Sequence, residues 1–360
     1  MFKALKGKIL IQVILLTFML LGVNSPALSN TSGINLIINF SGDVKVKKDE
    51  WSQWQKADSV RTLSPNDQIE IGTNSSATIY CSDLSEWTIN EPGTYWLYDG
   101  CSPGEATLKL PNSNNDTRRP GGIKEQALQS IPYIITPRNT SILNNQPTIR
   151  WNTVPGATQY KVIVEDWEAE TSETEIVYTG ELEAEFFYFV SVVADNSSSS
   201  EDEAEVGFMV LDEHKEKDTL VHIEAIKQQG LTKEVEGLVL AHLYRGNDLN
   251  AEAIEILEES IQVGSKQVSV YQLLGDIYQQ VGLSLEAKEI YLKGLALMKN
   301  VENIAGQASI QAELGEVEYA LGNEDEAIDW LEKAKAGYVA LEDGSQSEKL
   351  EQRINFILGR

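Results

Sequence analysis

The chain has 360 residues, with 55 Asp and Glu against 29 Lys and Arg and a formal net charge of −26 at pH 7. This length exceeds one typical domain, so several domains are expected, each with its own core. The negative charge excludes nucleic acid and anionic membrane surfaces as partners, because both would repel a chain that has no concentrated basic patch.

The first 29 residues have the features of an export signal. Three lysines precede an apolar run from Ile9 to Val23, and Ala27-Leu28-Ser29 forms a small-x-small cleavage site before Asn30. We therefore expect cleavage between Ser29 and Asn30 and a periplasmic or secreted protein of the bacterial envelope. The apolar run has 15 residues, fewer than the roughly 20 that a spanning helix needs. Membrane attachment is expected only if this signal is not cleaved.

Residues 34–110 contain short runs in which apolar and polar residues alternate, separated by Asn, Asp, Gly and Ser, which predicts an all-β module. The module resembles the FecR-like domain of bacterial envelope proteins in a series of residues, namely Gly42 to Val46, Trp54, Ala57, Leu63, Asn66 to Ile69, Gly72 and Ser76 to Ile79. Regulatory members of that family signal through a cytoplasmic N-terminal anti-sigma region. Only about eight residues precede the apolar run here, so the resemblance implies an extracytoplasmic binding or assembly domain.

The chain has two cysteines, Cys81 and Cys101, and both lie in the portion expected to be exported. Oxidising compartments allow disulfides to persist, so one bridge within this module is predicted. Free thiols or a metal pair are the alternatives. Zinc normally takes four ligands, and no histidine lies near either cysteine in the sequence.

Residues 111–130 are rich in Asn, Gly, Pro and charged residues and are expected to be a linker. Residues 131–212 then contain strand-like runs bounded by Pro, Gly and Asn, which predict a second β module. The segment from Pro147 to Val164 resembles the B and C strands of a fibronectin type III or related immunoglobulin-like sandwich. That resemblance makes Trp151 a core residue, with a sugar-stacking platform as the alternative.

One stretch of the second module is exceptionally acidic. From Val162 to Asp212 there are fifteen carboxylates and no Lys or Arg. Calcium prefers carboxylate oxygen, but the Asp-x-Asp-x-Asp-Gly loop of the common calcium site is absent. Solvated acidic loops are therefore favoured over a metal site.

After Asp212 the apolar period changes from 2 to 3.6, which predicts helices over residues 213–360, the first ending near Gly230. Ala253, Ala287 and Ala327 recur at intervals of 34 and then 40 residues. Around the second of them, Tyr271, Leu274-Gly275, Tyr278 and Gly282 resemble the first helix of a tetratricopeptide repeat. The resemblance covers residues 234–335 as three repeats, followed by a capping helix over 345–358. The longer second interval indicates either longer helices or a longer loop near residues 299–306. Unrelated helical hairpins are the alternative, but they do not explain the 34-residue recurrence.

In tetratricopeptide arrays the first helix of each repeat lines a concave binding surface. The resemblance places seven residues there, namely His242, Arg245, Gln272, Asp276, Gln279, Glu316 and Tyr319. This mixed, partly acidic lining suits a peptide with basic or amide groups better than an acidic one.

Motifs of catalysis are missing: there is no Gly-x-Ser-x-Gly, no Gly-x-x-x-x-Gly-Lys and no His-Glu-x-x-His. The three histidines, His214, His222 and His242, have no partner at ligand spacing. We expect a multi-domain, non-enzymatic interaction scaffold without cofactor or metal, in which a FecR-like β module and a β-sandwich precede an α-helical tetratricopeptide array. It would bind a protein or peptide, and the sequence assigns no oligomeric state. Two alternatives remain open: an extracytoplasmic signal sensor that uses the FecR-like module, or a protein that binds glycans or surface polymers through Trp51, Trp54, Trp87 or Trp96.

Overall fold

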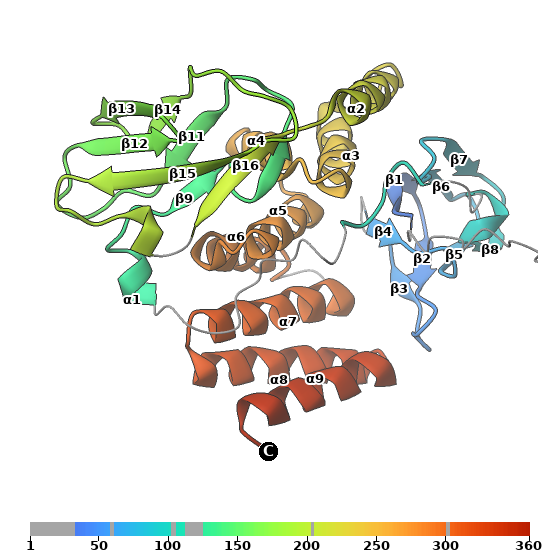
Figure 1. Cartoon of the computed structure of the whole chain (residues 1–360). Helices are drawn as coiled ribbons and strands as arrows, with labels where there is room; N and C mark the ends of the chain where they lie inside the picture. Colours follow the sequence, from blue (N-terminus) through green and yellow to red (C-terminus); the bar gives the residue numbers. More distant parts are fainter. Residues whose placement is uncertain (1–32, 58–60, 102–105, 112–124, 203–204, 300–302) are drawn as a thin grey trace, which may run out of the picture. The chain divides into compact units, whose positions relative to one another are not determined.

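The computed structural model describes residues 33–57, 61–101, 106–111, 125–202, 205–299 and 303–360. The expected export signal and its Ser29–Asn30 cleavage site lie outside these ranges. Within them no helix combines the length and the apolar character that crossing a membrane requires. Residues 31–360 form one contact unit, in which strands come first and helices follow (Figure 1).

The first β part forms two antiparallel four-stranded sheets, with strand orders β4-β1-β6-β7 and β3-β2-β5-β8. Alternate residues of these strands point into a shared core, which includes Ile37, Val46, Ile69 and Ile79. The strands are β1 (Asn35–Ser41), β2 (Val44–Lys47), β3 (Gln55–Lys56), β4 (Arg61–Leu63), β5 (Gln68–Ile71), β6 (Ser76–Tyr80), β7 (Glu86–Ile89) and β8 (Gly93–Trp96), and the 3-10 helix η1 (Leu97–Asp99) follows.

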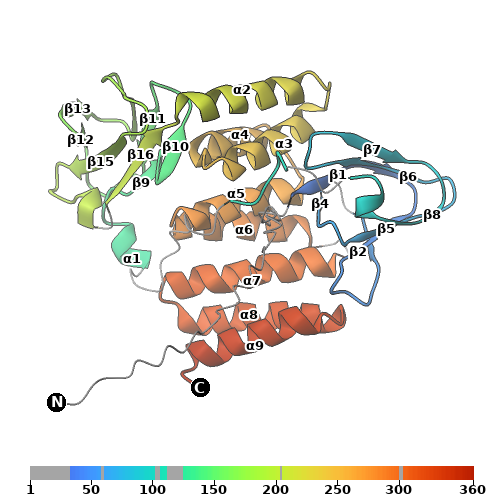
Figure 2. The ribbon, with the colours of Figure 1, turned by 45° about the vertical axis from the view of Figure 1, so that its right-hand side comes forward.

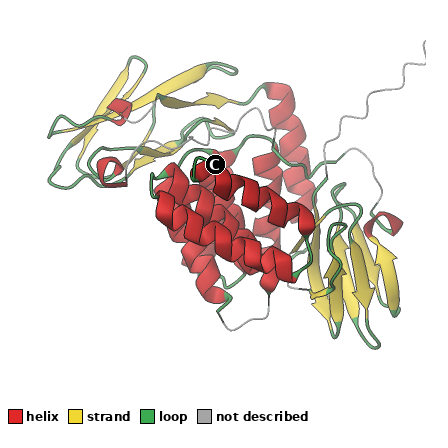
Figure 3. Cartoon of the chain, turned by 90° about the horizontal axis from the view of Figure 1, so that it is seen from below, coloured by secondary structure: helices red, strands yellow, loops and turns green. Residues whose placement is uncertain are grey.

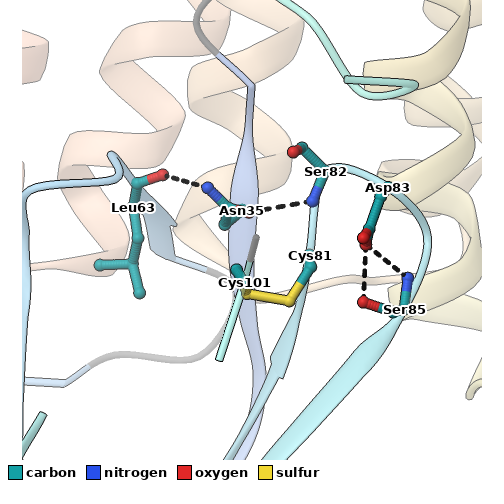
Figure 4. The surroundings of a disulfide bond; sticks show 7 residues. All are labelled: Asn35, Leu63, Cys81, Ser82, Asp83, Ser85 and Cys101. Carbon is teal, nitrogen blue, oxygen red and sulfur yellow. Dashed lines mark hydrogen bonds between the residues drawn. A yellow bond between two sulfur atoms is a disulfide. The ribbon is translucent and has the colours of Figure 1, made fainter. Parts of the chain in front are cut away.

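The predicted disulfide between Cys81 and Cys101 is confirmed, and both cysteines are buried in this core (Figure 4). Beside it, the buried Asn35 side chain ties three segments together. Its Nδ2 donates to the carbonyl of Leu63 at 3.3 Å, and its Oδ1 accepts from the backbone N–H of Ser82 at 2.9 Å. The bridge therefore fixes the end of β6 to the segment that follows η1, while Asn35 satisfies the neighbouring buried backbone groups.

The second β part pairs a five-stranded sheet, β10-β16-β15-β12-β13, with a three-stranded sheet, β14-β11-β9. Trp151 is 2% exposed and packs edge-on against Tyr160, with ring centroids 5.4 Å apart. Its expected core position is confirmed, and its burial leaves no face for a sugar. The elements are α1 (Glu125–Leu128), β9 (Ile134–Thr136), β10 (Thr140–Ile142), β11 (Thr148–Trp151), β12 (Tyr160–Val164), β13 (Trp167–Thr171), β14 (Glu175–Val177), β15 (Phe187–Ala194), η3 (Ser200–Asp202) and β16 (Val206–Val210).

The acidic stretch lies largely on the surface of this second part. Glu168 and Glu170 point outward from β13, an edge strand, where charged side chains discourage pairing with another chain. Among the described residues, no cluster of three or more His, Cys, Asp or Glu could hold a metal ion. Other carboxylates of the stretch accept hydrogen bonds, among them Glu165 from the backbone N–H of Phe189 and Asp195 from the hydroxyl of Thr158.

The C-terminal part is a helical array in which α3 to α9 follow one another as antiparallel neighbours (Figures 1 and 2). Coloured by type, the long helices lie together, and the strands lie in two separate groups that include short helical turns (Figure 3). The helices are α2 (Glu213–Lys227), α3 (Lys233–Gly246), α4 (Asn250–Gln262), α5 (Val268–Gln280), α6 (Ser284–Leu297), α7 (Ile304–Ala320), α8 (Glu324–Ala340) and α9 (Gly344–Ile357).

The three recurring alanines hold equivalent places in this array. Ala253, Ala287 and Ala327 are each the fourth residue of α4, α6 or α8, and none is exposed. The longer second interval comes mainly from α7, which has 17 residues where α5 has 13. One additional helical turn, rather than a long loop, therefore separates the second alanine from the third.

Close helix packing also depends on glycine, and a substitution at Gly275 of α5 tests this. A Cβ at this position would lie 2.5 Å from Cε1 of Tyr291 on α6, well inside contact distance. We expect Gly275→Val to lower the free energy of unfolding by about 1–3 kcal/mol through overpacking. Gly344→Val is the control, because a Cβ at Gly344 of α9 meets no atom within 4 Å. Equal urea midpoints for both variants would contradict this assignment.

Candidate functional site

A cleft of about 440 Å³ lies along α3, α5 and α7, the first helix of each successive helical pair. Such a volume is within the range of pockets that hold small ligands or short peptide segments. The helical array contributes residues from these three helices and from the ends of α6, α8 and α9, among them His242, Lys266, Ser269, Gln272, Asp276, Met298, Gly306, Ser309, Tyr338 and Gln346.

Two buried polar atoms border this cleft without a hydrogen-bond partner among the described residues, Nδ1 of His242 and Oγ of Ser269. Burial, and then the positive charge of Arg245, lower the pKa of His242 to about 3, so the imidazole is neutral at pH 7. A neutral imidazole nitrogen either accepts or donates a hydrogen bond, and a hydroxyl does both. An amide group is therefore a suitable hydrogen-bond partner for either atom.

Gln272 and Asp276 also border the cleft, and both are held by neighbours. Nε2 of Gln272 donates to Oγ of Ser309 at 2.8 Å, which links α5 to α7. Asp276 accepts from the hydroxyl of Tyr291 at 2.7 Å, and its other carboxylate oxygen lies 3.6 Å from Nη1 of Arg245. These contacts fix the orientation of both side chains before any partner arrives.

Arg245 and Gln279, the next two expected groove residues, are not among the described residues that border the cleft. Arg245 donates through Nε to Oε1 of Gln280 at 3.0 Å, so its guanidinium connects α3 to α5. Gln279 is buried, and its Nε2 lies 3.4 Å from the carbonyl of Glu313 on α7. Both side chains serve contacts between successive first helices.

Glu316 and Tyr319 of α7 are engaged by the last helix. Arg353 of α9 forms a two-pronged ion pair with Glu316, with Nε to Oε1 at 2.8 Å and Nη2 to Oε2 at 2.7 Å. The same guanidinium lies 4.4 Å from the ring centre of Tyr319. Helix α9 thus neutralises the acidic charge that the sequence places on this part of the surface.

The first β part supplies residues that sequence reasoning did not place at the cleft. Lys48, Glu50 and Trp51 of the β2–β3 connection border it, as do Thr62 and Ser64 near β4. Up to 290 residues separate this connection from the residues that it contacts in the helical part, so no local pattern in the sequence could have revealed the contact.

Trp51 is buried, being 5% exposed, and it packs into a small apolar cluster of the helical array. Of the other tryptophans considered for glycan binding, Trp54 lies beneath Nζ of Lys47 and Trp87 packs edge-on against Tyr95. Of the four tryptophans, Trp96 is the exposed one, at 38% exposure. It therefore holds the place most accessible to a polymer.

The charges at the cleft are mixed. Lys48 and Lys266 provide cationic groups, whereas Glu50, Asp276 and Asp343 are acidic. Asp343 caps α9 by accepting from the backbone N–H of Gln346 at 2.9 Å. The cleft therefore favours a polar, near-neutral ligand over one of high charge of either sign.

Residues 266–338, from just before α5 into α8, match the model of the tetratricopeptide repeat family. No curated protein matches the sequence.

Several solved structures are similar to part of the chain. BtubC (BKLC) from P. vanneervenii is 19% identical with a TM-score of 0.31, over 41% of this chain and 75% of that one. A MamA protein is 20% identical with a TM-score of 0.29, over 41% of this chain and 84% of that one. The TPR-like repeats of a Podosopora anserina putative kinesin light chain are 18% identical with a TM-score of 0.30, over 40% of this chain and 88% of that one. By its match to the family model, the C-terminal helical part of this chain contains tetratricopeptide repeats.

Proposed function

We propose that this protein is a non-enzymatic scaffold of the bacterial envelope that binds a peptide segment of a partner protein in its repeat cleft. One observation carries the proposal: His242 and Ser269, which line the cleft along α3, α5 and α7, each have a buried polar atom with no hydrogen-bond partner among the described residues. A buried polar atom without a partner costs free energy that a ligand can recover. A peptide backbone supplies a donor and an acceptor at every residue except proline, which is what these two atoms require.

The envelope location rests on the export signal expected over residues 1–29. The proposal takes the first β part as a FecR-like module and the second as an immunoglobulin or fibronectin type III-like sandwich. Their paired sheets and separate cores support this division. Both parts would then serve contact and assembly outside the cytoplasm.

Partner capture tests the cleft. Ser269→Trp fills the cleft with a large side chain, whereas Glu259→Trp adds the same side chain to the exposed face of α4. We expect chemical crosslinking in native envelopes to recover the same partner proteins with the wild type and Glu259→Trp, and at least tenfold less with Ser269→Trp. Equal recovery with all three proteins would refute binding in the cleft.

N-terminal sequencing tests the location. Protein isolated from the native envelope is expected to begin at Asn30, because cleavage should follow Ser29. A chain that still begins with Met1 would show that the signal is retained and would argue for a membrane-attached form instead.

A second candidate, glycan binding, is favoured by one exposed aromatic pair. Trp96 and Tyr98 stack with centroids 5.7 Å apart and planes 13° apart, at 38% and 48% exposure. Titration with envelope polysaccharide should change the tryptophan fluorescence of the wild type and leave Trp96→Ala unaffected. A flat titration of the wild type would dismiss this candidate.

A further inference from the structure

One end of the repeat cleft already contains a segment of the same chain. Trp51, in the connection between β2 and β3, packs with Ala305 of α7, Tyr338 of α8 and Leu341 at the end of α8. The next two residues, Ser52 and Gln53, are exposed, so the tryptophan alone is inserted. Burying a tryptophan side chain removes a large apolar surface from water, which makes Trp51 the anchor of this contact.

Two hydrogen bonds hold the residues that follow the anchor. Oγ of Ser52 donates to Oε2 of Glu342 at 2.5 Å, and Nε2 of Gln53 lies 3.4 Å from Oε1 of the same carboxylate. Glu342 is in the turn between α8 and α9. The segment is thus held by an apolar pocket that takes up its tryptophan and by a carboxylate that accepts hydrogen bonds from the next two side chains.

Glu342 has a backbone conformation that is unfavourable for a glutamate. Its φ is +57°, in the left-handed region that glycine adopts without cost. Glycine occupies the corresponding place after α4, α5 and α7, at Gly264, Gly282 and Gly322, each with positive φ, whereas after α3 the place is held by Asp248 at +60°. A glutamate there costs roughly 1 kcal/mol of backbone strain. The hydrogen bonds to the β2–β3 connection are what this side chain contributes in return.

We propose that residues 48–53 act as an internal ligand of the repeat cleft, and that the partner segment carries an aromatic residue followed by side chains that donate hydrogen bonds. The proposal rests on the cleft function proposed above and specifies the chemistry of the partner. Because Trp51 itself borders the cleft, a partner segment lying along α3, α5 and α7 meets it at the α7–α8 end. The aromatic residue of that segment takes the place of Trp51 against Ala305, Tyr338 and Leu341, so its binding requires that Trp51 leave this pocket.

Competition with a tethered segment lowers the apparent affinity for the partner. If the pocket is vacated in about a tenth of the molecules, the apparent dissociation constant is raised roughly tenfold. Removing the internal anchor should therefore improve binding of a matching segment by roughly that factor.

A synthetic peptide with the sequence of residues 48–54, Lys-Asp-Glu-Trp-Ser-Gln-Trp, is the probe. Labelled and blocked at both ends, it is titrated by fluorescence anisotropy against the full chain as wild type, Trp51→Ala and Trp54→Ala. Trp54 lies in the same connection beneath Lys47 and does not border the cleft among the described residues, so Trp54→Ala is the matched control. We expect Trp51→Ala to bind the peptide at least tenfold more tightly than the other two proteins. A peptide in which its first tryptophan is replaced by alanine should bind none of them.

The variant Glu342→Gly tests the same contact if Trp51→Ala folds poorly. Glu342→Gly restores glycine in a left-handed turn and removes the carboxylate, so the β2–β3 connection should detach while the array remains folded. Hydrogen exchange is then expected to rise at least tenfold at the start of α7 and in the α8–α9 turn. Unchanged exchange, or equal peptide binding by wild type and Trp51→Ala, would overturn the internal-ligand proposal. If the internal-ligand proposal failed in this way while Ser269→Trp still lost its envelope partners, partner binding in the cleft would remain supported.

Discussion

Alanine at both Cys81 and Cys101 is expected to lower the free energy of unfolding of the first β part by about 3 kcal/mol. The bridge closes a loop with a sequence separation of 20, and closing a loop of this length removes about that much conformational entropy from the unfolded chain. The two cysteines are 1% and 6% exposed, so alanine is preferable to serine, whose hydroxyl would be buried there. Calorimetry of the full chain should show the β transition shifted to lower temperature.

Reduction provides the control for this prediction. The wild type treated with a thiol reductant should unfold with the double variant, and oxidised wild type should be more stable than both. The helical transition should remain in place, since neither cysteine lies in the array. If oxidised wild type and the double variant unfolded together, the bridge would contribute nothing to stability.

The sequence was sufficient to predict the elements whose cause is local. The change of apolar period after Asp212 predicted a helix, and α2 begins at Glu213 with the Asp212 side chain accepting from two backbone N–H groups. The expected stop near Gly230 is also found, because that residue adopts a φ of +69°. The three recurring alanines are 0% exposed, as expected of small residues at which two helices pack closely.

Less of the candidate site than of the helices could be predicted from the sequence. The resemblance identified the first helices as the lining, and His242, Gln272 and Asp276 do border the cleft. It could not show that Arg353 of α9 engages Glu316, since that pairing depends on how a later helix packs. Nor could it place Trp51, because contacts between residues almost 300 positions apart leave no spacing in the sequence.

Glu252 of α4 is expected to make the protein less stable as the pH rises from about 4.5 to about 7. Its Oε1 accepts from the backbone N–H of Leu143 at 2.6 Å, while its Oε2 is buried with no hydrogen-bond partner among the described residues. Burial, supported by the charge of nearby Glu255, raises the pKa of this carboxyl to about 7, although the hydrogen bond from Leu143 acts to lower it. Glu175, Glu258 and Arg150 border the same cavity of about 320 Å³.

The protein loses stability as the pH rises because the folded and unfolded chains bind different numbers of protons. Between these two pH values the folded protein keeps a proton that the unfolded chain has lost, so raising the pH favours unfolding. Glu252→Gln imitates the protonated form at every pH. It should therefore exceed the wild type in free energy of unfolding by on the order of 3 kcal/mol at pH 8, and by little at pH 4.5. Urea titrations followed by helical circular dichroism at both pH values check this, and a constant difference would contradict it.

His242 acts in the opposite direction over an overlapping range. Burial and then Arg245 lower its pKa from 6.5 to about 3, so the unfolded chain binds the extra proton and acid favours unfolding below pH 6.5. From pH 4.5 to 6.5 each group changes the free energy of unfolding by up to about 1.4 kcal/mol per pH unit, with opposite signs. Between pH 4.5 and 6.5, the free energy of unfolding of Glu252→Gln should rise with pH, because His242 alone remains, and that of His242→Gln should fall. The double variant should again follow the wild-type slope. Parallel profiles for the two single variants would show that these buried groups do not oppose each other.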